Sequence, residues 1–66
     1  MTDKQRAFYN MCVEILDNGV GVSAAAYVAM LHYAADMNYY HTEDMLHKYV
    51  EATDGYYYLP EGFERI

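Results

Sequence analysis

Basic side chains are scarce in this 66-residue chain, which has four Lys and Arg against ten Asp and Glu and a formal charge of −6. No Lys or Arg occurs between Arg6 and Lys48. Because non-specific binding to nucleic acid depends on basic side chains that neutralise phosphates, we expect no direct contact with nucleic acid and no attraction to an anionic membrane. The charge favours a protein partner with a basic surface instead.

Cysteine and proline are each present once. Cys12 alone cannot form an internal disulfide, and no Cys/His zinc pattern includes it. The longest run without a charged residue, 18–35, is shorter than the roughly 20 apolar residues of a membrane span, so we expect no such span. Hydrophobic residues nevertheless make up 55% of the chain, which predicts an ordered domain rather than a disordered chain.

Helical spacing of apolar residues and three capping residues predict an all-α fold in a single domain, residues 1–66. Thr2 and Gln5 have the spacing of a capping box, and Ser23 and Thr42 are favoured N-caps. Three consecutive tyrosines favour an extended segment, which we expect to fold back on the helices. The prediction is a compact bundle of three short helices, at residues 3–17, 24–37 and 43–53, with an ordered aromatic C-terminal tail at 56–66.

The second predicted helix is apolar on nearly all sides. A helix of this kind is normally buried on nearly all sides. Two flanking helices in so short a chain offer it little cover, which favours an intermolecular contact and a homodimer. The residues that we assign to self-association lie on one face of this helix and are Ala26, Met30, Tyr33 and Met37.

The nine tyrosines are the most distinctive feature of the composition. Tyrosine joins a large apolar ring to a polar tip and loses little side-chain entropy on binding, so it is enriched at protein interfaces. Several of these tyrosines lie outside the predicted helices, close to acidic residues. The predicted partner-binding residues are Tyr39, Tyr40, Glu43, Asp44, Glu51, Asp54, Tyr56, Tyr57, Tyr58, Glu61 and Glu64.

No combination of residues indicates catalysis. Cys12 lies on the apolar side of the first predicted helix with no Lys or Arg beside it, so we interpret it as a small buried hydrophobe. Gly19-Val20-Gly21 lacks the rest of any phosphate-binding fingerprint. We therefore predict that the protein is not an enzyme and needs no cofactor.

Two pairs of side chains have a spacing at which both can reach one metal ion. His32 with Asp36, and His47 with Glu51, are each four residues apart on a predicted helix. No HExxH pattern is present, and we assign no residue to a metal. A small metal or ligand sensor remains an alternative function.

The connection between the first two predicted helices resembles the turn of helix-turn-helix DNA-binding proteins. The resemblance consists of a helix, Gly21-Val22-Ser23 and an Ala-rich helix. In that family the second helix places polar and basic side chains in the major groove, whereas here it contains no Lys or Arg. The resemblance implies a helix-turn-helix-like regulator that uses its fold for dimerisation, which is the first alternative function.

In its small size, negative charge and lack of catalytic residues, the chain resembles the small inhibitors that phages and mobile elements encode against host systems, including anti-CRISPR proteins. The leading prediction is a non-enzymatic interaction module that occludes a basic surface of a host macromolecule. Acidic residues interspersed with aromatic rings can occupy a nucleic-acid channel, so nucleic-acid mimicry is one form of this function. The expected location is the cytoplasm, that of the host cell if a phage encodes the protein.

Overall fold

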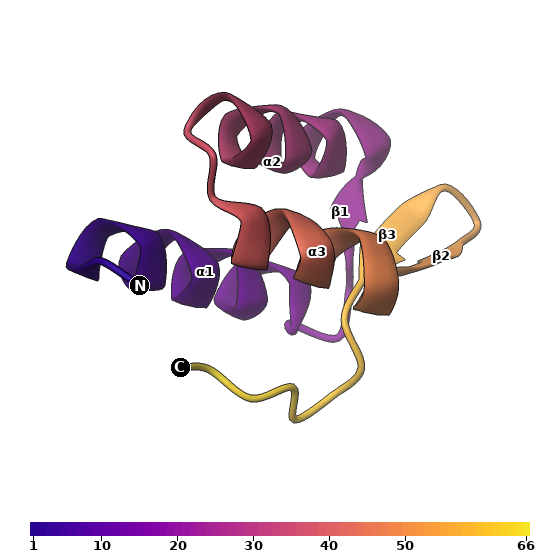
Figure 1. The fold of residues 1–66 in the computed structure, drawn as a ribbon. Coiled ribbons are helices and arrows are strands. Elements are labelled where there is room, and N and C mark those ends of the chain that lie inside the picture. Colours follow the sequence, from indigo (N-terminus) through magenta and orange to yellow (C-terminus); the bar gives the residue numbers. More distant parts are fainter.

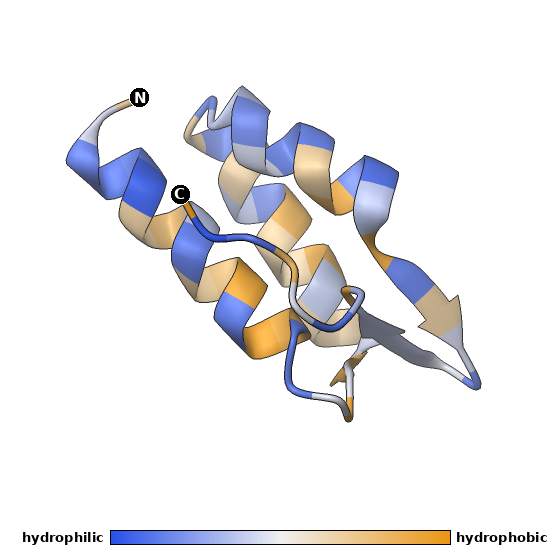
Figure 2. Ribbon diagram, turned by 90° about the horizontal axis from the view of Figure 1, so that it is seen from below, coloured by the Kyte–Doolittle hydropathy of each residue, from blue (hydrophilic) through white to orange (hydrophobic).

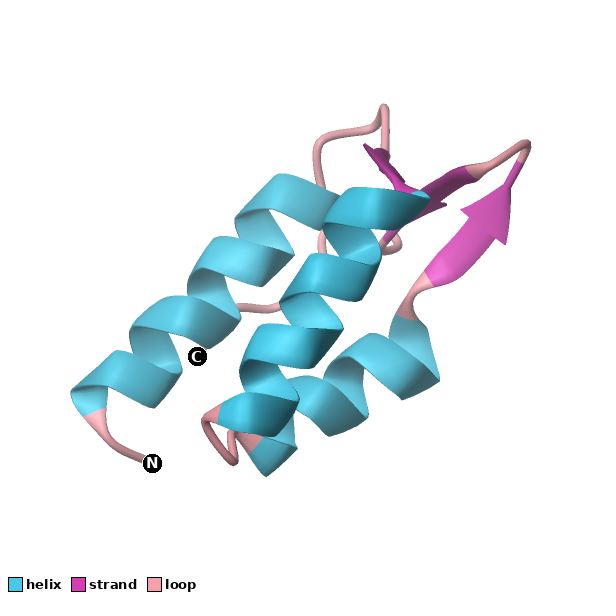
Figure 3. Ribbon diagram, turned by 90° about the horizontal axis from the view of Figure 1, so that it is seen from above, coloured by secondary structure: helices cyan, strands magenta, loops and turns pink.

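The computed structural model describes residues 1–66 and combines three helices with a small sheet. The sheet is antiparallel, has three strands in the order β1-β3-β2, and lies at one end of the helices (Figure 1, Figure 3). The fold is therefore α+β, and the predicted all-α bundle is wrong. In chain order the elements are α1 (Asp3–Leu16), β1 (Val22–Ser23), α2 (Ala24–Asp36), α3 (Tyr40–Tyr49), β2 (Glu51–Thr53) and β3 (Tyr56–Tyr58).

Of the three helices, α3 differs most from its predicted position. It begins at Tyr40 and ends at Tyr49, whereas a helix over 43–53 was expected. Thr42 is buried inside the helix and caps nothing, and the cap position itself has no side-chain hydrogen bond. Residues 51–53 leave the helix and pair with β3.

The reason for this early end is a two-residue hairpin turn. Asp54 and Gly55 have φ angles of 53° and 82°, which are the consecutive left-handed conformations of a type I′ turn. Thr53 faces Tyr56 across that turn. Asp-Gly is a common sequence for such turns, because Gly has no side chain to oppose a positive φ. The pair reverses the chain into a hairpin instead of merely stopping a helix.

The three consecutive tyrosines form the central strand of the sheet rather than the start of a tail. Val22 pairs with Tyr57 on one side, and Ala52 pairs with Tyr57 on the other. After β3 the chain turns back along α1, where the Leu59 amide donates to the Leu16 carbonyl at 3.0 Å. The Asn10 side chain bonds both backbone groups of Ile66, at 2.8 and 2.7 Å, so the last residues lie against α1 (Figure 2).

The starts of the first two helices follow the capping prediction. Thr2 Oγ1 accepts from the Gln5 amide, and Gln5 Oε1 accepts from the Thr2 amide, which completes the capping box. Ser23 Oγ accepts from the Ala26 amide at the start of α2. These bonds satisfy amides that have no partner within the helix, which is why both helices begin where the capping residues place them.

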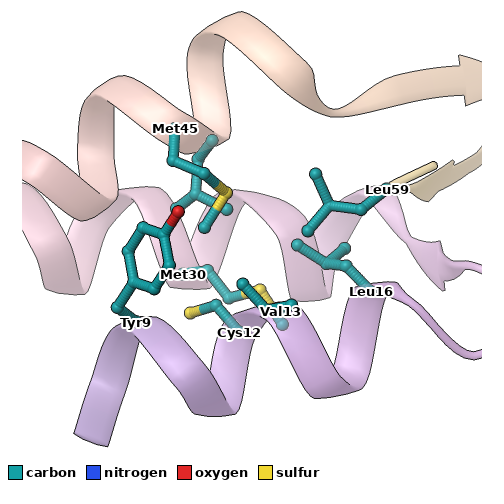
Figure 4. Packing of buried hydrophobic residues seen from close by; sticks show 8 residues of the cluster. Tyr9, Cys12, Val13, Leu16, Met30, Met45 and Leu59 are labelled. Carbon is teal, nitrogen blue, oxygen red and sulfur yellow. The ribbon is translucent and has the colours of Figure 1, made fainter. Parts of the chain in front are cut away.

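The core lies mainly between α1 and α3, with contributions from α2 and from the residue after β3 (Figure 4). α2 buries only Met30 and Ala34, although its sequence is the most apolar of the three helices. Much of its apolar surface therefore remains uncovered within one chain. The buried cluster consists of Tyr9, Cys12, Val13, Leu16, Met30, Met45, Leu46 and Leu59.

Candidate functional site

An open cleft lies beside the sheet, where three segments far apart in the sequence meet. One wall comes from the end of α1 and the loop before β1, another from the β2–β3 hairpin, and the third from the chain after β3. The predicted tyrosines and acids are well represented in it. Its lining residues are Asp17, Gly19, Val20, Thr53, Asp54, Tyr56, Tyr58, Leu59, Pro60 and Glu61.

The loop wall is shaped by a side chain that replaces missing backbone partners. Asn18 Oδ1 accepts from the amides of Val20 and Gly21, at 2.8 and 2.9 Å. A short polar side chain that bonds the following amides in this way stabilises a tight turn. The turn leaves the Val20 side chain 74% exposed at the edge of the cleft. This apolar group is therefore available to a ligand.

The hairpin wall places alternate tyrosines of β3 on opposite sides of the sheet, as a strand requires. Tyr56 and Tyr58 line the cleft, and the Tyr58 hydroxyl lies 2.9 Å from Thr53 Oγ1 across the hairpin. Tyr57 faces the other way and stacks on Tyr27, with ring centroids 4.6 Å apart. Tyr57 is thus part of the packing between sheet and α2 and is not a cleft residue.

The cleft is negatively charged and partly aromatic. Three carboxylates line it, those of Asp17, Asp54 and Glu61, together with the rings of Tyr56 and Tyr58, and no Lys or Arg lines it. Carboxylates form charge-assisted hydrogen bonds with guanidinium and ammonium groups, and tyrosine rings attract the same cations. The arrangement therefore suits a basic side chain of a partner.

The structure separates the remaining predicted partner-binding acids from this cleft. Glu43, Asp44 and Glu51 do not line it, and Asp44 forms a salt bridge with Lys48 at 3.3 Å. Glu64 lies in a different groove, which it shares with Glu61. Of the predicted acids, only Asp54 and Glu61 therefore line this cleft.

Two predicted tyrosines also lie elsewhere. Tyr39 is buried at 8% exposure and packs against Phe8 and Tyr33, so it belongs to the interior and is removed from the predicted surface. Tyr40 is exposed, and its hydroxyl donates to Asn38 Oδ1 at 3.1 Å, at the opposite end of α3 from the hairpin.

Asp17 and Val20 are cleft residues that the sequence-based prediction missed. Their position depends on the contact of the chain after β3 with the end of α1, and only the Asn18-Gly19 turn signal pointed to a loop there.

The residues assigned to self-association are only in part on the surface. Met30 is part of the core, so it cannot form a surface contact. Ala26 is half-buried, whereas Tyr33 and Met37 are exposed. Only part of the predicted face of α2 is therefore available to another chain.

The histidines do not belong to a cluster of metal-binding side chains. No group of three or more His, Cys, Asp or Glu side chains lies close enough together to hold an ion. His41 packs its ring on Tyr9, with centroids 5.1 Å apart, and the three histidines are all exposed. The metal or ligand sensor therefore gains no support from a cluster of this kind and stays a prediction.

Cys12 is completely buried, and this burial raises the pKa of its thiol to about 11, from an ordinary value of 9.0. Because the thiolate is the reactive form, we expect alkylation by iodoacetamide at pH 8 to be at least about a hundredfold slower in the folded chain than in urea. The raised pKa also makes stability fall as pH rises from about 9 towards 11, because the unfolded chain loses its proton first. Equal alkylation rates would contradict the burial of Cys12.

Neither a family model nor a curated protein nor a solved structure matches this chain. No helix has both the length and the apolar character that crossing a bilayer requires.

Proposed function

We propose that this protein is a non-enzymatic interaction module that captures a basic side chain of a partner protein in the cleft beside its sheet. The observation that carries the proposal is the convergence of Asp17, Asp54 and Glu61 with two tyrosine rings, without any basic residue in the lining. By seating itself on a basic surface, the module would inhibit that surface by occlusion. The cytoplasm is the proposed location, since the only cysteine is a free, buried thiol.

The cleft accounts for specificity better than net charge alone does. A chain with a formal charge of −6 attracts any basic surface at long range. Only a group of the right shape can place its charge among the three carboxylates while its apolar stem contacts Val20 and Tyr56. Arg meets both requirements, because its guanidinium pairs with carboxylates in two hydrogen bonds and stacks on aromatic rings.

The test compares two triple variants that change the net charge equally. The cleft variant carries Asp17→Asn, Asp54→Asn and Glu61→Gln. The comparison variant carries Glu43→Gln, Asp44→Asn and Glu51→Gln, which are predicted acids outside the cleft. The Asp54→Asn change keeps the hairpin, because Asn-Gly also favours a type I′ turn.

We expect the cleft variant to bind a peptide of alternating Arg and Gly about tenfold more weakly than the wild type, because each exposed charge pair contributes only modestly to binding. The comparison variant is expected to lose much less. Amide chemical shifts of Val20, Tyr56 and Tyr58 should move on titration with the peptide. Equal weakening in both variants would show that only net charge matters and would reject the cleft.

The same pair of variants extends the test to the natural partner. A partner captured from lysate of the native or host cell should be retained by the wild type and by the comparison variant, and lost by the cleft variant. Its release at moderate salt is expected, because exposed charge pairs are screened. If the cleft variant still retains the partner, the partner does not bind at the cleft.

A further inference from the structure

A second surface of the molecule, away from the cleft, is an apolar groove between α1 and the end of α2. It is open to solvent, with Met11, Tyr33 and Met37 each between 45% and 47% exposed. Nearly half of each of these residues is left uncovered within one chain, and they are too large and too close together to be scattered surface residues. The side chains that form it from the two helices are Lys4, Ala7, Phe8, Met11, Tyr33 and Met37.

Lys4, Ala7 and Met11 on the α1 side of this groove belong to a stripe with heptad spacing that continues beyond the groove to Glu14. Successive residues of a helix turn by about 100°, so Lys4, Ala7, Met11 and Glu14 fall on one face. This face lies opposite the buried one, to which Tyr9, Val13 and Leu16 belong among others. One face of α1 therefore packs in the core, and the opposite face is exposed to solvent.

The order of residues along the stripe is self-complementary. In an antiparallel pair of identical helices with the twofold axis at the level of residue 9, Lys4 faces Glu14 of the second copy, and Ala7 faces Met11 of the second copy. Each pair occurs twice by symmetry. A basic residue thus meets an acidic one, and a small side chain meets a large one.

Lys4 and Glu14 have no ionic partner within the chain. Arg6 pairs with Asp3 at 3.2 Å and Lys48 pairs with Asp44 at 3.3 Å, and these are the only salt bridges in the structure. Of the ten acidic residues, Glu14 alone lies on the stripe, and its charge is balanced there by that of Lys4, so the stripe itself has no net charge.

From this complementarity we propose that a second copy of the chain occupies the groove and that the protein is a homodimer through α1. Each α1 lies antiparallel to its counterpart, with the stripe of Lys4, Ala7, Met11 and Glu14 at the centre. Tyr33 and Met37 of α2 cover the flank of the incoming helix. No residue that lines the acidic cleft also lines the groove.

The assignment differs from the face expected from the sequence. That face lay on the second helix alone and included Met30, which is buried. The structure transfers the centre of the contact to α1 and keeps Tyr33 and Met37 at its edge.

The experiment measures the mass of the full chain in solution by sedimentation equilibrium, from about 10 µM to about 1 mM, for the wild type and four variants. Lys4→Glu and Glu14→Lys each place like charges opposite one another. The double variant Lys4→Glu/Glu14→Lys restores opposite charges with the same net charge as the wild type. Lys48→Glu is the matched control, because it changes the net charge as Lys4→Glu does but lies on α3.

We expect a dimer for the wild type, the charge-swapped double variant and the Lys48→Glu control. Each single stripe variant should raise the dissociation constant of the dimer about tenfold or more, since the pair occurs twice. Neither change should unfold α1, because an acid in its first turn and a base in its last turn both interact favourably with the helix dipole.

Two results would overturn the proposal. If the wild-type chain stays monomeric up to the highest concentration, a second copy does not occupy the groove. A dimer that tolerates both single variants as well as the double variant would use another surface. Rescue by the charge swap is the result that only direct pairing of Lys4 with Glu14 explains.

Discussion

Replacement of Leu16 by Ala is expected to lower the free energy of unfolding by about 3 kcal/mol. Leu16 is the last residue of α1 and is 0% exposed, so the substitution empties a volume that the surrounding side chains can refill only in part. A domain of this size has a total stability of roughly 3–10 kcal/mol. The change should therefore remove a large part of the stability, and urea or thermal unfolding followed by circular dichroism measures it.

The position of Leu16 explains why the loss should be large in this fold. Its side chain lies among the core residues, and its carbonyl accepts from the Leu59 amide, so it marks the point where the chain after β3 docks on α1. The control is Val28→Ala on α2, a branched aliphatic residue that is 42% exposed. We expect that change to alter stability by less than about 1 kcal/mol. Comparable losses in the two variants would contradict the core described above.

Helical parts of the fold could be predicted because their signals are local. The capping box of Thr2 and Gln5 and the cap at Ser23 each act within three residues, so the sequence alone places the starts of α1 and α2. The strands carry no comparable signal. They have only two or three residues each, too few for an alternating pattern, and their pairing joins Val22 to Tyr57 across about half of the chain.

The Asp54-Gly55 pair shows how the same residues support two interpretations. Helical spacing continues through Val50 and Thr53, so Gly55 can be taken as the stop of a helix. Two consecutive positive φ angles make it a hairpin turn instead. The decisive factor is non-local, because β3 gains a partner on each side only if residues 51–53 are a strand.

The candidate site, too, could be predicted only in part from the sequence. Composition identified acids and tyrosines near the C-terminus, and four of them, Asp54, Tyr56, Tyr58 and Glu61, do line one cleft. Alternation along a strand removes Tyr57 from that group. Asp17 could not be assigned to it from the sequence, because the contact of the chain after β3 with α1 brings it there.

Substitution of Gly21 by Ala tests the sheet itself and is expected to cost about 3 kcal/mol. Gly21 precedes β1 and has a φ of +88°, where an L side chain is strained. A Cβ at this position would lie 3.1 Å from Tyr56 Cβ and 3.1 Å from the Tyr57 carbonyl oxygen. Backbone of the central strand cannot move aside without disturbing its pairs on both sides.

Gly19 in the same loop provides the matched control. Its φ is +78°, but a Cβ there meets nothing within 4 Å. Gly19→Ala is therefore expected to lower the free energy of unfolding by about 1 kcal/mol, from the strain of a positive φ alone. Gly21→Ala adds the close approach of its Cβ to β3 to this strain. The urea midpoints of the two variants should differ accordingly, with faster amide hydrogen exchange at Tyr57 in Gly21→Ala only. Equal losses would mean that the loop does not approach β3, and the three-stranded sheet would then lack its β1 edge.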